Sequence, residues 1–149
     1  MSNPPHTPPS ASPDPGTVAL TREYRFEAAH MLPRVPDGHR CKRLHGHSYK
    51  VEVTVAGPVD EDSGWLIDFY DLDRAVVPHI EALDHRTLND LPGLDNPTCE
   101  RLCDWLWRRL APSLPQLSAI TVWETTDARC SYYGPRSAAG YGPRSAPAG

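Results

Sequence analysis

The chain has 149 residues, of which 39% are hydrophobic and 23% are charged, close to the averages of soluble globular proteins. No apolar run approaches the roughly 20 residues that cross a bilayer, so a membrane protein is not expected. The formal net charge of -4 and the pI near 5.9 argue against a general nucleic-acid binder. We therefore expect one compact domain that acts on small molecules.

The two ends of the chain differ in composition from the middle. Residues 1–16 hold six prolines and almost no large apolar side chains, which predicts a disordered arm. The sequence Tyr-Gly-Pro-Arg-Ser-Ala occurs twice near the other end, so residues 135–149 are expected to be a low-complexity tail. The first residues do not resemble a secretory signal, and we expect a cytoplasmic location. The predicted domain is 17–134.

Four segments have the residue pattern of strands. Residues 18–26 and 48–56 alternate apolar and polar side chains, as half-buried strands do. Residues 117–125 continue this pattern, with 129–133 as a short hairpin partner. The apolar positions are Leu20, Tyr24 and Phe26 in the first, Tyr49, Val51, Val53 and Val55 in the second, and Ile120 and Val122 in the third.

Two helices are predicted between the second and third strands. The first opens at Asp71 and contains Pro78, which argues against a straight helix. The second starts at Asn96 as N-cap, with Pro97 in its first turn, and ends before Pro112. The expected fold class is α+β, a four-stranded antiparallel sheet with both helices on one face.

Three histidines form the densest group of reactive side chains. His45 and His47 are two apart in a predicted strand and so point the same way, and His30, just past the first strand, can join them. Three imidazoles form the ligand set of a catalytic zinc with an open fourth position. The competing interpretation is that two of them are ordinary surface histidines.

Cys41 lies close to these histidines in the sequence. It could be a fourth ligand and close a structural site. It could instead be a base beside an open metal, because a nearby cation favours the thiolate. The spacing does not choose between these roles.

Two carboxylates stand at positions that suggest chemistry. Asp84 precedes His85 at the end of the first predicted helix, and a carboxylate beside an imidazole orients a proton carrier. The alternative is a solvated helix end. Glu124 falls on the apolar face of a predicted strand, where a carboxylate is costly unless it is paired or functional. It could accept two hydrogen bonds from a 2-aminopyrimidinone edge.

The remaining polar candidates are less specific. A basic patch beside the histidines either steers an anionic substrate such as a triphosphate or is a solvated loop; it comprises His39, Arg40, Lys42 and Arg43. Cys99 and Cys103 are four apart on the second predicted helix and are interpreted as small core residues.

These segments together resemble the family of 6-pyruvoyltetrahydropterin and 6-carboxytetrahydropterin synthases. The resemblance covers about residues 20–134 and is most specific to the bacterial 6-carboxy branch, which shares the Cys-x-x-x-His-Gly-His spacing. The motifs are Phe-Glu-Ala-Ala-His30, Cys41-Lys-Arg-Leu-His45-Gly-His47, Ile-Asp-Phe69, Leu-Asp84-His85-Arg-Thr-Leu-Asn89, Asn96-Pro-Thr98 and Trp-Glu124-Thr125.

The resemblance implies a tunnelling fold (T-fold) that trimerises into a β-barrel and stacks as a hexamer, a dimer of trimers, with active sites between subunits. It also implies a reaction that belongs to queuosine-type 7-deazapurine biosynthesis. In this lyase reaction 7,8-dihydroneopterin triphosphate and water give 6-carboxy-5,6,7,8-tetrahydropterin, acetaldehyde and triphosphate.

The resemblance further implies a role for each matching residue. The zinc ligands are His30, His45 and His47, and the proton acceptor is Cys41. The second proton-transfer pair is Asp84 and His85, and the substrate residues are Glu124, which anchors the pterin, Thr125 and Thr98. Two rivals are a 6-pyruvoyltetrahydropterin synthase, which eliminates triphosphate without cutting the side chain, and a non-catalytic zinc protein closed by Cys41.

Overall fold

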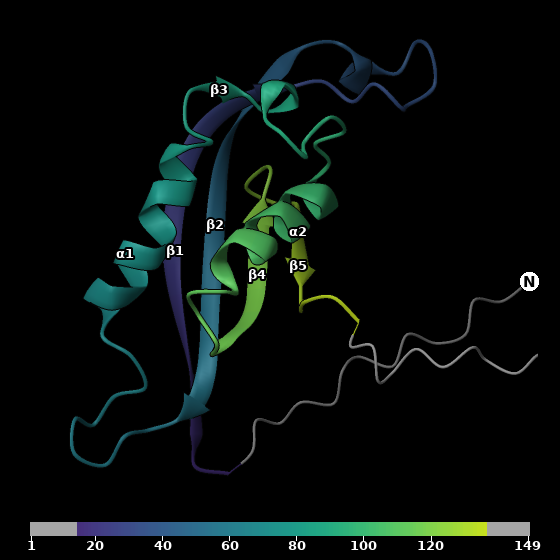
Figure 1. Ribbon diagram of the computed structural model, residues 1–149. Helices are drawn as coiled ribbons and strands as arrows, with labels where there is room; N and C mark the ends of the chain where they lie inside the picture. Colours follow the sequence, from purple (N-terminus) through teal and green to yellow (C-terminus); the bar gives the residue numbers. More distant parts are fainter. Residues whose placement is uncertain (1–14, 137–149) are drawn as a thin grey trace, which may run out of the picture.

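The computed structural model describes residues 15–136. It contains a five-stranded sheet in the order β3-β1-β2-β4-β5, antiparallel except for β3, which runs parallel to β1 (Figure 1). The strands are β1 Thr17–His30, β2 His45–Pro58, β3 Arg86–Thr87, β4 Leu117–Trp123 and β5 Arg129–Tyr132, the helices α1 Phe69–Glu81 and α2 Cys99–Leu110, and the 3-10 turns η1 Arg40–Lys42 and η2 Leu88–Asp90.

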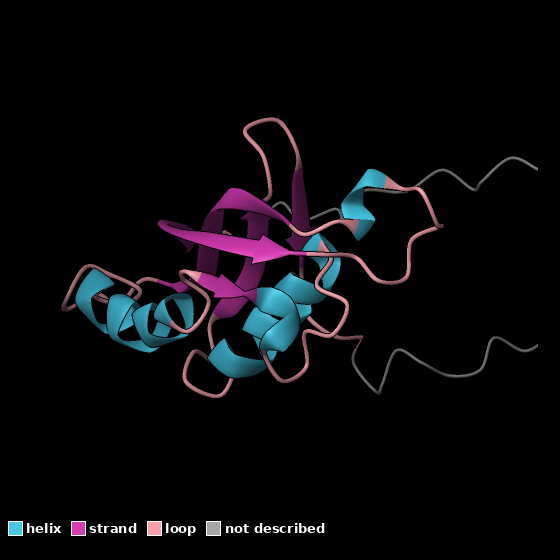
Figure 2. Cartoon of the chain, turned by 90° about the horizontal axis from the view of Figure 1, so that it is seen from above, coloured by secondary structure: helices cyan, strands magenta, loops and turns pink. Residues whose placement is uncertain are grey.

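The predicted α+β class is confirmed. Both helices lie on the same side of the sheet, as Figure 2 shows, and their buried side chains join one core with the sheet. Alternate β2 residues face this core: Tyr49, Val51, Val53 and Val55 are at most 1% exposed. The period-2 pattern of the sequence therefore identified the correct face of the strand.

The expectation of a four-stranded, purely antiparallel sheet is wrong by one strand. β3 has only two residues, Arg86 and Thr87, which pair with Ala28 and Ala29. A pair this short has no apolar alternation from which it could be predicted. Among residues 15–136, the sheet does not close into a barrel within one chain.

Both helices begin at residues other than those predicted. α1 begins at Phe69, because the Asp68 side chain accepts a hydrogen bond from the Tyr70 N–H and caps the helix there. Pro78 lies in the last turn, and the helix continues past it to Glu81. α2 begins at Cys99 with Thr98 as N-cap rather than Asn96.

Two expectations about the site residues also change. His30 is the last residue of β1, not a residue beyond it, and it pairs with His45, the first residue of β2. Asp84 and His85 do not end α1, which stops at Glu81, but lead directly into β3.

The arm 1–16 and the tail 135–149 lie for the most part outside the described residues, so their disorder stays a prediction. Within residues 15–136, neither helix has the length and apolar character to cross a membrane.

Candidate active site

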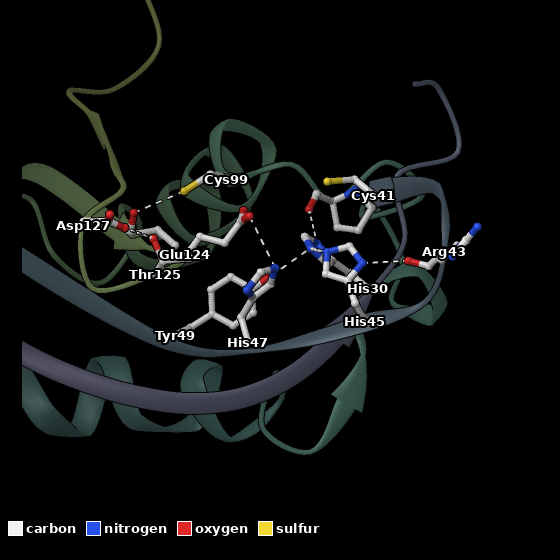
Figure 3. A network of polar contacts seen from close by, with 12 residues as sticks. His30, Cys41, Arg43, His45, His47, Tyr49, Cys99, Glu124, Thr125 and Asp127 are labelled. Atoms are coloured by element: carbon white, nitrogen blue, oxygen red, sulfur yellow. Dashed lines mark hydrogen bonds and ion pairs between the residues drawn. The ribbon is translucent and has the colours of Figure 1, made fainter. Parts of the chain in front are cut away.

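The three histidines converge on one point at the end of the sheet. His30 and His45 are cross-strand partners, and His47 points to the same face as His45. One ring nitrogen from each lies within 4.8 Å of the others. Figure 3 shows the three rings close together, and His45 and His47 share their face of β2 with the buried Tyr49. His30 is 1% exposed, whereas the other two are partly open to the surface.

Backbone carbonyls fix the orientation of two of these rings. His30 Nδ1 lies 2.9 Å from the Pro97 carbonyl oxygen, and His45 Nδ1 lies 2.7 Å from that of Arg43. A carbonyl oxygen only accepts, so each Nδ1 carries the proton and each Nε2 presents a lone pair. The two Nε2 atoms are 3.0 Å apart. Two lone pairs at this distance repel each other unless a cation or a proton lies between them.

Nε2 of His47 is also available to bind a cation. This nitrogen is buried and has no hydrogen-bond partner among residues 15–136. The nearest charge is Glu124 Oε1 at 3.4 Å, which forms an ion pair only if the imidazole is protonated. Burial lowers the pKa of His30 and of His47 below 6.5, although the Glu124 charge acts in the opposite direction. Neutral imidazoles are the form that binds a metal.

These features fit a zinc ion. Three imidazole nitrogens converge, and two of the rings are oriented by hydrogen bonds from their second ring nitrogen. Nε2 of the third ring is buried without a hydrogen-bond partner among residues 15–136. Metal-ligating histidines are almost always fixed in this way by a carbonyl or carboxylate. The donor set leaves room for a fourth, non-protein ligand.

A cavity of about 340 Å³ opens beside the histidines. It is lined by Arg40, Cys41, His45, His47, Glu124 and Thr125. Cys41 comes from η1, the two histidines from β2, and the last two from the turn between β4 and β5. One side of the molecule thus brings together predicted metal, proton-transfer and substrate residues that are far apart in the sequence.

Glu124 lies just beyond β4 rather than within a strand. Its backbone N–H donates to the Ala128 carbonyl at 3.2 Å, which closes the turn. Thr125 Oγ1 donates to Asp127 Oδ1 at 2.8 Å within the same turn. The tight turn holds the Glu124 carboxylate toward His47, as Figure 3 shows.

Asp84 and His85 line no part of that cavity. His85 lines a second hollow of about 490 Å³ that also includes Glu27 and Ser48, and the two hollows share His47. Asp84 Oδ2 lies 2.9 Å from His85 Nδ1, and the Glu27 N–H donates to Asp84 Oδ1 at 2.9 Å. The bond from Glu27, followed by that from His85, lowers the pKa of the Asp84 carboxyl. The pair is preorganised, but Cys41 of the same chain does not line the hollow of His85.

Thr98 is the N-cap of α2, and its Oγ1 accepts the Arg101 N–H at 3.2 Å. It does not line the cavity of Cys41. Of the basic patch, only Arg40 lines the cavity, and Lys42 pairs with Asp37.

The other cysteines have structural contacts. Cys99 Sγ donates to the Val122 carbonyl at 3.2 Å, and Cys103 Sγ to that of Cys130 at 3.5 Å. Burial raises the pKa of Cys99 to about 12, so this thiol is protonated and does not resemble a metal ligand.

Sequence reasoning missed Tyr49 as a neighbour of the site. It is 1% exposed, and its hydroxyl lies 3.3 Å from His30 Nδ1. The period-2 pattern gave the signal, because residues 45, 47 and 49 share one face. The role of the Pro97 carbonyl had no signal in the sequence, since every residue has such a group.

Comparison with known proteins agrees with this geometry. Residues 19–135 match the family described as 6-pyruvoyl tetrahydropterin synthase. The chain is 37% identical over 123 residues to 6-carboxy-5,6,7,8-tetrahydropterin synthase of Synechocystis sp., covering 78% of this chain and 94% of that protein. It is 41% identical over 127 residues to the protein of that name from Bacillus subtilis, covering 79% and 86%. The structure is similar to Caenorhabditis elegans 6-pyruvoyl tetrahydropterin synthase, with a TM-score of 0.74 and 26% identity over 80% of this chain and 96% of that one.

Proposed function

Because the chain belongs to the 6-pyruvoyl tetrahydropterin synthase family and has its T-fold, we propose that it is a zinc-dependent 6-carboxy-5,6,7,8-tetrahydropterin synthase. The substrates are 7,8-dihydroneopterin triphosphate and water, and the products are 6-carboxy-5,6,7,8-tetrahydropterin, acetaldehyde and triphosphate. The observation that carries the proposal is the cavity shared by Cys41, Glu124, Thr125 and two of the three histidines. The enzyme would serve queuosine-type biosynthesis in the cytoplasm.

The metal would be held by His30, His45 and His47. Bound there, zinc would polarise oxygens of the substrate side chain and ease loss of a neighbouring proton. The carbonyl-oriented rings and the orphaned Nε2 of His47 support this assignment.

Two residues of the same cavity would act directly on the substrate. Glu124 anchors the pterin by accepting hydrogen bonds from its 2-aminopyrimidinone edge, with Thr125 beside it. Cys41 accepts a proton from the side chain. The side-chain carbon attached to the ring would be oxidised while the ring is reduced from dihydro to tetrahydro, and triphosphate would leave from the far end of the side chain. Water would then add to the ring-attached carbon and the carbon-carbon bond beside it would break. That carbon stays on the pterin as the carboxylate, and the other two carbons leave as acetaldehyde.

The second proton-transfer pair, Asp84 and His85, would come from another copy of the chain, because within one chain Cys41 and His85 line different hollows. Two sheet edges offer the surfaces for such assembly. β5 is the last strand at one edge of the sheet. At the other edge, β3 covers only the end of β1, so among the described residues no strand pairs with the outer side of β1 over residues 18–26. Unpaired edges of this kind invite strand addition. A head-to-tail ring of three chains, stacked in pairs as a hexamer, would close the barrel.

The shared site can be tested by mixing two inactive variants. Cys41→Ala and His85→Ala subunits are unfolded, combined in equal amounts and refolded. If each site takes its two residues from different chains, about a quarter of the sites in randomly mixed oligomers regain both. If both residues act within one chain, no site is restored and the mixture stays inactive.

The reaction itself is tested with purified zinc-loaded protein and 7,8-dihydroneopterin triphosphate. Mass spectrometry of the pterin and a coupled assay for acetaldehyde are the readouts. Carboxytetrahydropterin with acetaldehyde supports the proposal. Triphosphate release with a pyruvoyl product would assign the sister activity, and absence of turnover would favour a non-catalytic zinc protein.

A further inference from the structure

The segment 84–89 runs beside the C-terminal end of β1. Its backbone pairing with β1 is short, and side-chain hydrogen bonds extend the pairing at both ends. At one end, the Glu27 N–H donates to Asp84 Oδ1 at 2.9 Å and the Glu27 carbonyl accepts the His85 N–H at 2.6 Å. β3 then pairs with Ala28 and Ala29 through its backbone. A two-residue strand is thus lengthened by a carboxylate.

Asn89 performs the same task at the other end. Its Oδ1 accepts the Met31 N–H at 2.9 Å, and its Nδ2 donates to the Met31 carbonyl at 2.8 Å. A carboxamide has the donor and acceptor of a peptide unit, so it replaces a neighbouring strand for this one residue. Both backbone groups of Met31 are satisfied by a single side chain.

Met31 directly follows His30, so this clamp sets the backbone at the end of β1. The same Nδ2 lies 3.4 Å from the Asp95 carbonyl, in the segment whose Pro97 carbonyl orients the His30 ring. Asn89 therefore contacts both the residue that follows His30 and the segment that fixes the tautomer of its ring. Among the described residues, no other side chain forms a hydrogen bond with the Met31 backbone.

We propose that Asn89 is a positioning residue of the metal site and acts through His30; this rests on the proposed metal site. It holds the strand end so that Nε2 of His30 points at the position shared with His45 and His47. Met31 lies at the surface and is 37% exposed, so removal of Asn89 does not open a cavity in the buried core. The main loss is therefore the fixed position of His30, not packing of the core.

The test compares zinc affinity in full-length variants by competition with a chromogenic chelator. Asn89→Ala is expected to weaken zinc binding by about 10- to 100-fold, as loss of an outer-shell partner does. The matched control is Asp73→Ala. Asp73 also ties a segment to β1, through Arg22 and Tyr24, but near the middle of the strand and away from His30. Its removal should leave zinc affinity within about twofold.

A second variant separates geometry from charge. Asn89→Asp keeps the acceptor for the Met31 N–H but turns an oxygen toward the Met31 carbonyl. The added negative charge attracts a cation, so weaker zinc binding in this variant cannot be an effect of the charge itself. Replacement of zinc by cobalt adds a spectroscopic readout, because the visible absorption of the bound ion reports its coordination geometry, which a general loss of stability does not change.

The outcomes distinguish the inference from the proposed function. Weaker zinc binding and an altered cobalt spectrum in the two Asn89 variants, but not in Asp73→Ala, support it. Affinity unchanged in the Asn89 variants, or lowered equally in the control, overturns this inference alone. If the unsubstituted chain binds no zinc, the metal site and the inference both fail.

Discussion

Replacement of Thr98 separates two roles that the residue can have, capping of α2 and contact with the substrate. Thr98 Oγ1 accepts the Arg101 N–H, and loss of such a cap costs typically about 1 kcal/mol of folding free energy. Unfolding entropy is about 2.1 cal/mol/K per residue, so over residues 15–136 a loss of about 1 kcal/mol lowers the melting temperature by about 4 °C. Thr98→Ser keeps the hydroxyl and should restore most of the loss.

The assay is thermal unfolding of metal-free protein at one fixed protein concentration, with KM for dihydroneopterin triphosphate measured on the zinc-loaded form. We expect Thr98→Ala to melt about 4 °C lower with KM unchanged, because Thr98 does not line the cavity of Cys41. An unchanged melting temperature with a raised KM would refute this reasoning and make Thr98 a substrate residue.

The other predictions concern the histidines and Cys41. Cys41→Ala should keep zinc, measured as metal per chain, while acetaldehyde release falls by about 10²- to 10⁴-fold, as for loss of a proton-transfer group; loss of zinc would instead make Cys41 a ligand. Because burial lowers the pKa of His30 and His47, the unfolded chain binds more protons than the folded chain just below pH 6.5. Metal-free protein should therefore lose stability in urea as the pH falls from 7.5 to 5.5, and replacement of His47 by Gln should reduce that loss. If the change of unfolding free energy with pH were the same in the His47→Gln variant, His47 would not be a source of the pH dependence.

The sequence predicted elements wherever a long apolar pattern exists. β2 is recognised because its buried residues alternate without interruption. β1 was placed too short because Ala28 and Ala29 have low strand propensity, although pairing with β2 extends the strand to His30. The helix starts were misplaced because the cap depends on which side chain reaches a free N–H, and Asp68, Thr98 and Asn96 are all suitable residue types.

Some residues of the candidate site could be predicted from the sequence, and some of its contacts could not. The metal donors were predictable, since His45 and His47 share a face and His30 ends the adjacent strand. The separation of His85 from Cys41 was not, because it depends on how the segment after α1 turns back along β1. Contacts made through backbone groups, such as that of Pro97 with His30, leave no signature in residue types.

The pairing of His30 with His45 has a consequence for the loop between them. Residues 31–44 leave the sheet at one candidate ligand and return at the other, and they include both Arg40 and Cys41. An ion bound to both histidines would link the two ends of this loop, so the ends could not separate unless a coordination bond broke. A chelator would therefore impair the enzyme twice, by removing the ion and by loosening the loop that presents the thiol, while the core beneath the helices stays folded.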